Sequence, residues 1–284
     1  MVEFLVYGAV TSAIYAMLAV GFTLIFGVAR VLNLSHGTFY ALGAYFTFTY
    51  NGLAKIPLLP AALLAIATVA AFGVLMERFL VRPLRHSALA VLMITLAVSL
   101  LIEQVLFLIF GSEYQNVRSF VSAKVVIAGV DLGGQRLLTL GVGTALIAGL
   151  WLFIQRTRLG SAILAVSQDP NAAQYMGINT NRVFTIVMAI SAALAATAGV
   201  MVAPFLTVQP GMGLVPMIKA FSIVILGGLG SIPGSLLAAV VLGYSETLVG
   251  YLISSSYTEL VSLVAILLAL ILRPTGLFGK LEAF

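Results

Sequence analysis

The chain has 284 residues, of which 62% are hydrophobic and only 8% are charged, and its mean hydropathy is +1.16. Soluble domains carry about 25% charged residues, so this composition excludes a soluble fold and indicates a membrane protein. The net charge of +5 is spread along the chain, without the basic runs that bind nucleic acid. No cysteine is present, which excludes disulfides and thiolate metal sites.

Continuous apolar runs approach or exceed the ~20 residues that a helix needs to cross a bilayer. They do not alternate as the strands of a membrane barrel do. We therefore predict an all-α, polytopic membrane domain over residues 1–284, with about eight or nine spanning segments. In chain order these are residues 4–27, 31–50, 58–80, 88–110, 137–155, 183–206, 217–229, 235–252 and 257–272. The N-terminus lacks a basic stretch and so predicts a first span, not a cleaved signal.

Segment 217–229 is short for a full crossing, and the glycine-rich GGLGSIPG at 227–234 separates it from the next helix. GGLGSIPG is no phosphate loop, because no GxxxxGKS or GxxxxGKT motif occurs in the chain, and its glycines predict a tight turn and a close helix crossing. Small residues at a spacing of four, such as Gly8, Ser12 and Ala16, also predict close packing, either within the chain or between subunits.

Basic residues in short loops mark the cytoplasmic side of a membrane protein. One alternating topology has the N-terminus outside and the C-terminus inside. It places nine basic residues in the cytoplasm: Arg30, Arg78, Arg82, Arg85, Arg156, Arg158, Arg182, Arg273 and Lys280. Five remain outside: Lys55, Arg118, Lys124, Arg136 and Lys219. An outside N-terminus and an inside C-terminus require segment 217–229 to cross or nearly cross the membrane. If the segment is re-entrant, the last two helices have the opposite orientation.

The segment RTRLGSAILAVSQDPNAAQYMGI, which begins at Arg156, is too polar to cross a bilayer. Asp169 is a good N-cap, Pro170 suits the first helical position, and Gly177 can take the left-handed conformation that ends a helix. We therefore predict a helix of about two turns over residues 170–176. Before it, residues 161–167 can form another short turn, with Gly160 as a flexible start.

Four residues would connect two spans, so a capped helix in this loop indicates a docking element. The alternative is an interfacial helix lying on the lipid headgroups. Such helices usually have a Lys- and Arg-rich polar face, whereas residues 170–176 carry no charge, which favours a protein partner. The small side chains of Ala165, Ala172 and Ala173 suit a close contact with that partner.

Three segments together resemble one known family. They are RTRLGSAILAVSQDPNAAQYMGIN at 156–179, GFTLIFGVARVLNLSHGTFYALGAY at 21–45 and VILGGLGSIPGSLLAAVVLG at 224–243. The chain resembles the permease subunits of branched-chain amino acid ABC importers over nearly its whole length, in the shorter of their two types. It departs mildly at Ser35, where the family often has alanine.

The resemblance implies a transporter and not an enzyme, in a prokaryotic inner membrane. It implies a second permease subunit, two ATPase subunits that bind ATP and magnesium, and an external solute-binding protein. Residues 160–177 would form the coupling helix, which moves with the ATPase dimer and switches the permease between inward- and outward-facing states. The substrate stays open, because similar permeases serve leucine-type and other amino acids and small amides.

Several polar residues within the apolar segments are candidates for a translocation path. Asn33, Ser35 and His36 either line such a path or brace a helix end, and His36 alone makes no metal site. Glu103 and Glu246 are ionisable groups inside predicted spans, where charges are costly and often functional. For Glu103, near the outer third of its span, the alternative is a side chain that simply reaches the surface.

The longest predicted external segment is 111–136. It either docks the binding protein through Arg118 and Lys124 or merely connects two helices. A secondary transporter is the alternative function, with NLSHG at 33–37 and GGLGSIPG as paired helix breaks, but the sequence shows no convincing internal repeat.

Overall fold

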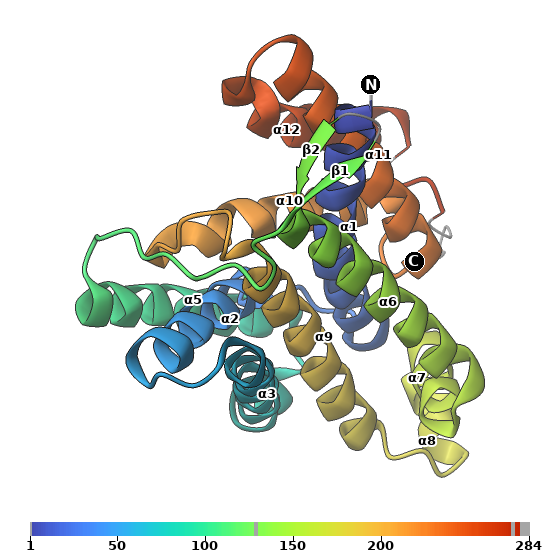
Figure 1. Ribbon diagram of the computed structural model, residues 1–284. Coiled ribbons are helices and arrows are strands. Elements are labelled where there is room, and N and C mark those ends of the chain that lie inside the picture. The colour runs from blue at the N-terminus through green and yellow to red at the C-terminus, as the bar shows by residue number, and fades with distance from the viewer. Residues whose placement is uncertain (1, 128–129, 274–275, 279–284) are drawn as a thin grey trace.

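The computed structural model describes residues 2–127, 130–273 and 276–278 and confirms a helical membrane protein (Figure 1). Within these residues, seven helices are long and apolar enough to cross a membrane. They cover Val2–Ala29, Leu58–Leu84, Ala88–Phe110, Gly134–Arg156, Thr180–Val202, Pro210–Gly227 and Ile232–Leu252, and a shorter apolar helix follows at Ser255–Ile271. The predicted cytoplasmic Lys280 lies outside the described residues.

The first helix, α1 (Val2–Ala29), packs against α11 (Ile232–Leu252), α9 (Thr180–Val202) and α6 (Gly134–Arg156). Its small residues allow this close packing. A Cβ added at Gly243 of α11 would lie 2.7 Å from the Ser12 backbone nitrogen, and one at Gly8 would meet the Tyr244 ring. The predicted close packing at Gly8 and Ser12 is therefore confirmed, and it is intramolecular.

The second helix begins later than predicted. α2 (His36–Phe48) starts five residues after position 31 and continues as a π-helical turn, η1 (Thr49–Leu53). The Asn33 side chain accepts a hydrogen bond from the Ser35 backbone nitrogen at 3.0 Å. This local bond competes with helix formation and keeps residues 31–35 out of the helix. α2 packs closely on α9, where a side chain at Gly199 would collide with the Tyr40 carbonyl.

Next, α3 (Leu58–Met76) runs into a π-helical turn, η2 (Glu77–Val81), and a short helix, α4 (Arg82–Leu84). α5 (Ala88–Phe110) follows, with Ser87 as its N-cap. Most of the large apolar side chains of α5 are exposed, among them Leu100, Leu101 and Leu108. This helix therefore presents a broad apolar face to lipid or to another subunit.

The predicted external segment 111–136 is more ordered than a loop. It contains a hairpin of β1 (Lys124–Ile127) and β2 (Val130–Gly133), in which Lys124 pairs with Gly133 and Val126 with Asp131. α6 begins at Gly134, so Arg136 lies in a helix and not in the loop. Its guanidinium carbon lies 4.3 Å from the centre of the Tyr7 ring, which ties the start of α6 to the N-terminal turns of α1.

The short segment 217–229 proves longer than predicted. A 3-10 turn, η3 (Pro210–Gly213), leads directly into α10 (Leu214–Gly227), and the pair forms a candidate span of 18 residues. Lys219 lies within α10, inside the segment 217–229 that was expected to cross or nearly cross, and its predicted placement on the outer side stays a prediction. Gly228 and Gly230 have φ of 104° and 82°, and a Cβ at Gly227 would lie 2.5 Å from the Gly234 carbonyl carbon. The predicted tight turn and close crossing are confirmed.

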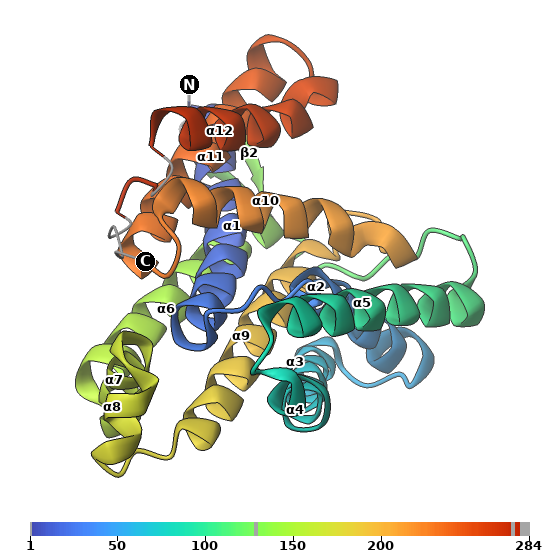
Figure 2. The ribbon, with the colours of Figure 1, turned by 180° about the vertical axis from the view of Figure 1, so that it is seen from behind.

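The last described elements are η4 (Ser255–Tyr257) and α12 (Thr258–Leu272). In both ribbon views, α7 (Arg158–Gln168) and α8 (Pro170–Tyr175) lie together at one end of the molecule (Figures 1 and 2). The N-terminus, the hairpin and α12 lie at the opposite end. The two polar segments of the sequence are therefore on opposite ends of the helical bundle.

Candidate functional site

The segment between α6 and α9 consists of two helices, and the side chain of an N-cap residue begins each of them. Thr157 Oγ1 accepts from the Gly160 nitrogen at 2.9 Å and begins α7. Asp169 Oδ1 accepts from the Asn171 and Ala172 nitrogens at 2.8 and 3.0 Å and begins α8. Gly177, with φ of 84°, follows the end of α8. The predicted caps at Asp169 and Gly177 are confirmed.

α7 differs from the predicted short turn at 161–167, because it is a helix of 11 residues. It is amphipathic and buries Ile163 and Val166 against the bundle, while Ala165 is half-buried. Gly160 lies within this helix and is buried; a Cβ there would be 2.5 Å from the Ile154 Cα atom. Gly160 is therefore required for close packing on the end of α6 and does not act as a flexible start.

α8 presents a different face to its surroundings than the sequence predicts. Ala173 is only 4% exposed and packs on its own chain, which corrects the expectation that it faces a partner. Ala172 is exposed, as expected, and Pro170 is half-buried. Two large side chains stand free at the end of the helix, with Tyr175 91% and Met176 84% exposed. The outward surface of α8 is therefore partly apolar and bulky.

A buried ion-pair cluster, which the sequence reasoning missed, ties the start of α9 to the end of α3. Glu77, 2% exposed, accepts from Arg82 Nη2 at 3.0 Å, Arg85 Nη2 at 2.7 Å and Thr185 Oγ1 at 2.7 Å. Arg85 also donates to Asn181 at 3.3 Å. We call Glu77, Arg82, Arg85 and Thr185 the Glu77 cluster. It fixes the first turns of α9, which begins at Thr180, four residues after Met176.

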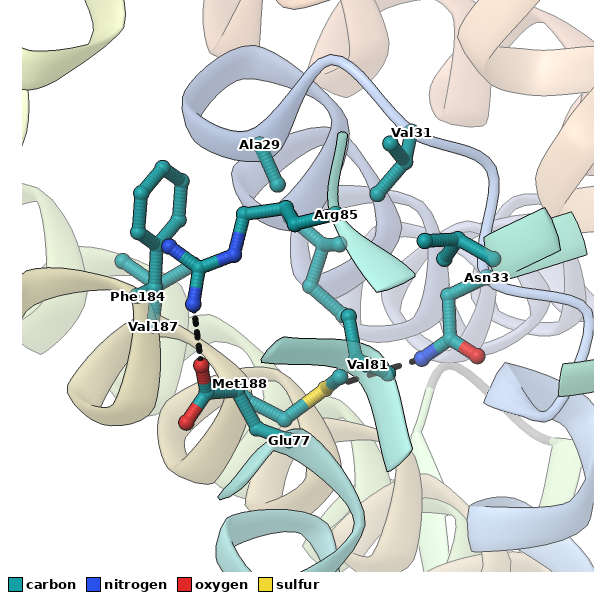
Figure 3. Close-up of a pocket in the computed structure, with 11 residues that line it drawn as sticks. Ala29, Val31, Asn33, Glu77, Val81, Arg85, Phe184, Val187 and Met188 are labelled. Atoms are coloured by element: carbon teal, nitrogen blue, oxygen red, sulfur yellow. Dashed lines mark hydrogen bonds and ion pairs between the residues drawn. The ribbon is translucent and has the colours of Figure 1, made fainter. Parts of the chain in front are cut away.

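Figure 3 shows Arg85 reaching past the Phe184 ring toward Glu77, in a small pocket that Ala29 and Val31 also line. The Arg85 guanidinium carbon lies 3.9 Å from the centre of the Phe184 ring. Burial lowers the pKa of Arg85, while the Glu77 carboxylate acts in the opposite direction. Since an arginine stays protonated in proteins, a charged pair persists here. From the sequence, Arg82 and Arg85 indicate only the cytoplasmic side of the membrane. The sequence feature that could have predicted the ion pairs is Glu77, which lies five residues before Arg82 and eight before Arg85.

Asn33, Ser35 and His36 have the geometry of a brace. His36 Nε2 lies 2.9 Å from the Leu18 carbonyl oxygen and its Nδ1 lies 3.3 Å from Ser191 Oγ. Ser35 donates to the Thr95 carbonyl at 2.6 Å. The Asn33 amide points at the Met188 sulfur at 3.6 Å (Figure 3). All three side chains are buried between helices, and their place on a translocation path stays a prediction.

Glu246 is the centre of a second buried cluster. Its carboxylate accepts from Lys219 Nζ at 2.7 Å, from Ser262 Oγ at 2.6 Å and from the Tyr15 hydroxyl. Lys219 Nζ also lies 2.6 Å from the Tyr15 oxygen. The cluster joins α1, α10, α11 and α12. Its geometry is that of a structural tie, and a role of Glu246 in a path stays a prediction.

A cleft opens between α2, α5 and the η3–α10 unit and holds about 1140 Å³ of space, part of it open to the surroundings. Most of its lining is apolar, including Leu96, Leu100, Met217 and Phe221. Among the described lining residues, three are polar: Thr38, Ser99 and Glu103. Of the sequence-predicted path residues, Glu103 alone lines this cleft.

The predicted docking residues Arg118 and Lys124 are both exposed. Lys124 begins β1, which lies at the end of the molecule that carries the N-terminus (Figure 1). A docking role of the two residues stays a prediction. Among the described residues, no group of three or more His, Cys, Asp or Glu side chains is placed to hold a metal ion.

Comparisons with known proteins identify relatives along nearly the whole chain. The model of the branched-chain amino acid transport system permease component matches residues 4–270. The high-affinity branched-chain amino acid transport system permease protein BraD of Pseudomonas aeruginosa is 33% identical, over 98% of this chain and 95% of its own length. The permease protein LivH of Escherichia coli K12, named for the same kind of system, is 31% identical over 97% and 94%. The ribose import permease protein RbsC of Escherichia coli K12 is 29% identical over 92% and 82%. No solved structure gives a significant match.

Proposed function

The chain belongs to the family of branched-chain amino acid transport permeases, and from this premise we propose that it carries branched-chain amino acids across the membrane within an ATP-driven importer. Because the chain has no nucleotide-binding motif, ATP and magnesium bind to two separate ATPase subunits. A second permease subunit completes the pathway, and an external solute-binding protein delivers the substrate.

The observation that carries this proposal is the α7–α8 segment. It projects at one end of the bundle, is held by caps at Thr157 and Asp169, and exposes Tyr175 and Met176. An uncharged, rigid helix with bulky apolar side chains suits a groove in a protein partner better than a headgroup layer, where cationic faces prevail. We propose that α8 docks on the ATPase, and that the Glu77 cluster passes its movement from α9 to α3.

The same division of the molecule supports the membrane orientation that we propose. The end with α7 and α8 faces the cytoplasm, and the end with the N-terminus and the β1–β2 hairpin faces outward in a prokaryotic inner membrane. Exposed Arg118 and Lys124 then lie where an external binding protein would approach. Cationic side chains there steer an acidic partner to the permease.

The test is transport in proteoliposomes that contain this chain and the proposed partner subunits. Uptake of radiolabelled L-leucine should require both ATP and the binding protein, and isoleucine and valine should compete. Leucine counterflow by this chain without ATPase subunits would indicate a secondary transporter and overturn the proposal. Competition by ribose, motivated by the ribose permease relative, would contradict the substrate class.

A further inference from the structure

Glu103 differs from the other buried acids of the membrane domain. Glu77 and Glu246 each have three side-chain partners, including at least one cation. Within the described residues, no hydrogen bond or ion pair is formed by the Glu103 carboxylate. It lies partly buried on the apolar helix α5 and lines the cleft. A charge inside a membrane span without a partner is costly and marks a functional site.

The surroundings of Glu103 leave its carboxylate accessible from the cleft. The opposite wall at this level is η3, where Gly211 has no side chain, and a Cβ added there would lie 3.2 Å from Glu103 Oε1. Ser99 lies one helical turn before Glu103 and hence on the same face of α5. Thr38 Oγ1 donates to Ser99 Oγ at 2.8 Å, so the three polar lining residues that the structure describes form one strip along the cleft.

The remainder of the cleft is apolar. Leucines of α5 form one wall, and Met217, Ile218 and Phe221 of α10 form the other. A solute that fits therefore needs one cationic group for the carboxylate and an aliphatic body for the walls. A cationic group of a ligand would neutralise the Glu103 carboxylate, as Lys219 neutralises Glu246.

We propose that the cleft is a solute-binding site in which Glu103 accepts the ammonium group of an aliphatic amino acid while the α5 and α10 walls bury its side chain. The inference deepens the transport function proposed above and rests on it. It assigns recognition of the amino group to this chain, in addition to any selection by a binding protein.

Labelling of a single cysteine tests the site without ATP or binding protein. Leu96 lines the cleft and is seven residues before Glu103, so Leu96→Cys reports on the same face of α5. The chain has no cysteine of its own. In vesicles that contain the chain with the second permease subunit and the ATPase subunits, the probes are L-leucine, L-leucine methyl ester and 4-methylpentanoate, which lacks the amino group. A methanethiosulfonate reagent measures how far each probe protects the cysteine.

We expect L-leucine and its methyl ester to slow labelling of Leu96→Cys at least fivefold, and 4-methylpentanoate to leave the rate unchanged. Adding Glu103→Gln should abolish the protection, whereas Glu103→Asp should retain part of it. A cationic reagent should also react faster than an anionic one, and Glu103→Gln should remove this preference. Leu108→Cys, exposed on α5 away from the cleft lining, and exposed Glu113→Gln serve as controls.

Equal protection by leucine and 4-methylpentanoate, no protection by leucine, or unchanged protection in Glu103→Gln would each overturn the inference. Co-purification of the partner subunits with Glu103→Gln shows that the variant is assembled. ATP-driven uptake is measured separately, so its failure in the unaltered complex would count against the transport function and not against the site.

Discussion

Lys219 and Glu246 form a buried ion pair whose partners lie on different helices. Their side chains are 12% and 5% exposed, and Tyr15 and Ser262 satisfy the remaining bonding positions. Removing one member of a buried pair leaves an uncompensated charge, whereas replacing both often costs little. The pair therefore predicts strong coupling between the two positions.

We expect Lys219→Met and Glu246→Gln each to lower the free energy of unfolding by about 3 kcal/mol. The double variant should lose clearly less than the sum of the two. Unfolding by sodium dodecyl sulfate in mixed micelles measures all three. Glu113→Gln is the matched control, since surface changes stay within about 0.5 kcal/mol. Additive losses would contradict the coupling.

Asp169 is the residue on which the start of α8 depends. Replacing an N-cap aspartate by alanine costs about 1 kcal/mol, which corresponds to about a fivefold change in the opening equilibrium. Asp169→Ala should therefore speed hydrogen exchange of the amides of residues 172–176 about fivefold. Asp169→Asn keeps an acceptor oxygen and should exchange like the original chain. Equal protection in all three would show that the cap does not stabilise α8.

At the residue scale, the sequence predicts what depends on neighbours along the chain. The caps at Asp169 and Gly177 were predicted because their partners lie within three residues. The partners of Glu77 and Lys219 could not be predicted, because Thr185 and Glu246 approach them only in the folded bundle. The inward direction of Ala173 likewise depends on how α8 lies on α9.

At the scale of elements, hydropathy predicts which segments span the membrane. It does not predict the residues at which the helices begin and end. α2 begins at His36 because Asn33 holds the preceding turn. α10 gains a 3-10 turn from Pro210–Gly213, which hydropathy around 217–229 did not include. The hairpin in 111–136 consists of two strands of four residues each, which are too short for hydropathy to distinguish from the predicted external loop. Predicting the cleft requires the relative positions of α2, α5 and α10, which the sequence does not give. The sequence does indicate Glu103, because of its charge within a span.

The two faces of α8 give a paired test of docking. Ala172 is exposed and Ala173 is buried, so the same substitution acts in different ways. Ala172→Trp should strip the ATPase from the purified complex, because overpacking a fitted contact costs about 1–3 kcal/mol, and leave the thermal stability of the permease unchanged. Ala173→Trp should instead lower that stability, because the tryptophan disrupts the packing of the chain itself.

Thr144→Trp, on the exposed face of α6, is the matched control and should affect neither property. A helix that lies on lipid headgroups would tolerate Ala172→Trp, because tryptophan favours the membrane interface. Co-purification of a normal amount of coupled ATPase with Ala172→Trp would therefore defeat the docking proposal.

At the scale of the whole molecule, the contacts among the loops and helix ends form two sets, one at each end of the helical bundle. At one end, Arg30 donates to the Gln168 carbonyl at 3.5 Å, and Gly27 at the end of α1 packs on Gly230. The Leu277 nitrogen donates to the Leu226 carbonyl at 2.8 Å, which brings the C-terminal residues to the same end.

The opposite end has its own contacts. The Gln115 and Val208 backbones exchange hydrogen bonds at 3.0 and 2.9 Å, and Arg136 stacks on Tyr7. This division agrees with an outside N-terminus, an inside C-terminus and an α10 that crosses the membrane. It disfavours the re-entrant alternative, which would place Leu277 and Gln168 at different ends.

Single cysteines in the cysteine-free chain test this topology directly. Ser119, Asn171 and Arg273 are exposed and lie in the segments whose sides the topology assigns. An impermeant maleimide added to intact cells should label Ser119→Cys and miss Asn171→Cys and Arg273→Cys, which should react only after permeabilisation. Labelling at 119 and 273 but not 171 would mean that an odd number of the spans between α8 and Arg273 cross the membrane, as a re-entrant α10 predicts, and would overturn the cytoplasmic placement of Arg273. Labelling at 171 from outside would place α8 beyond reach of a cytoplasmic ATPase and overturn the coupling role.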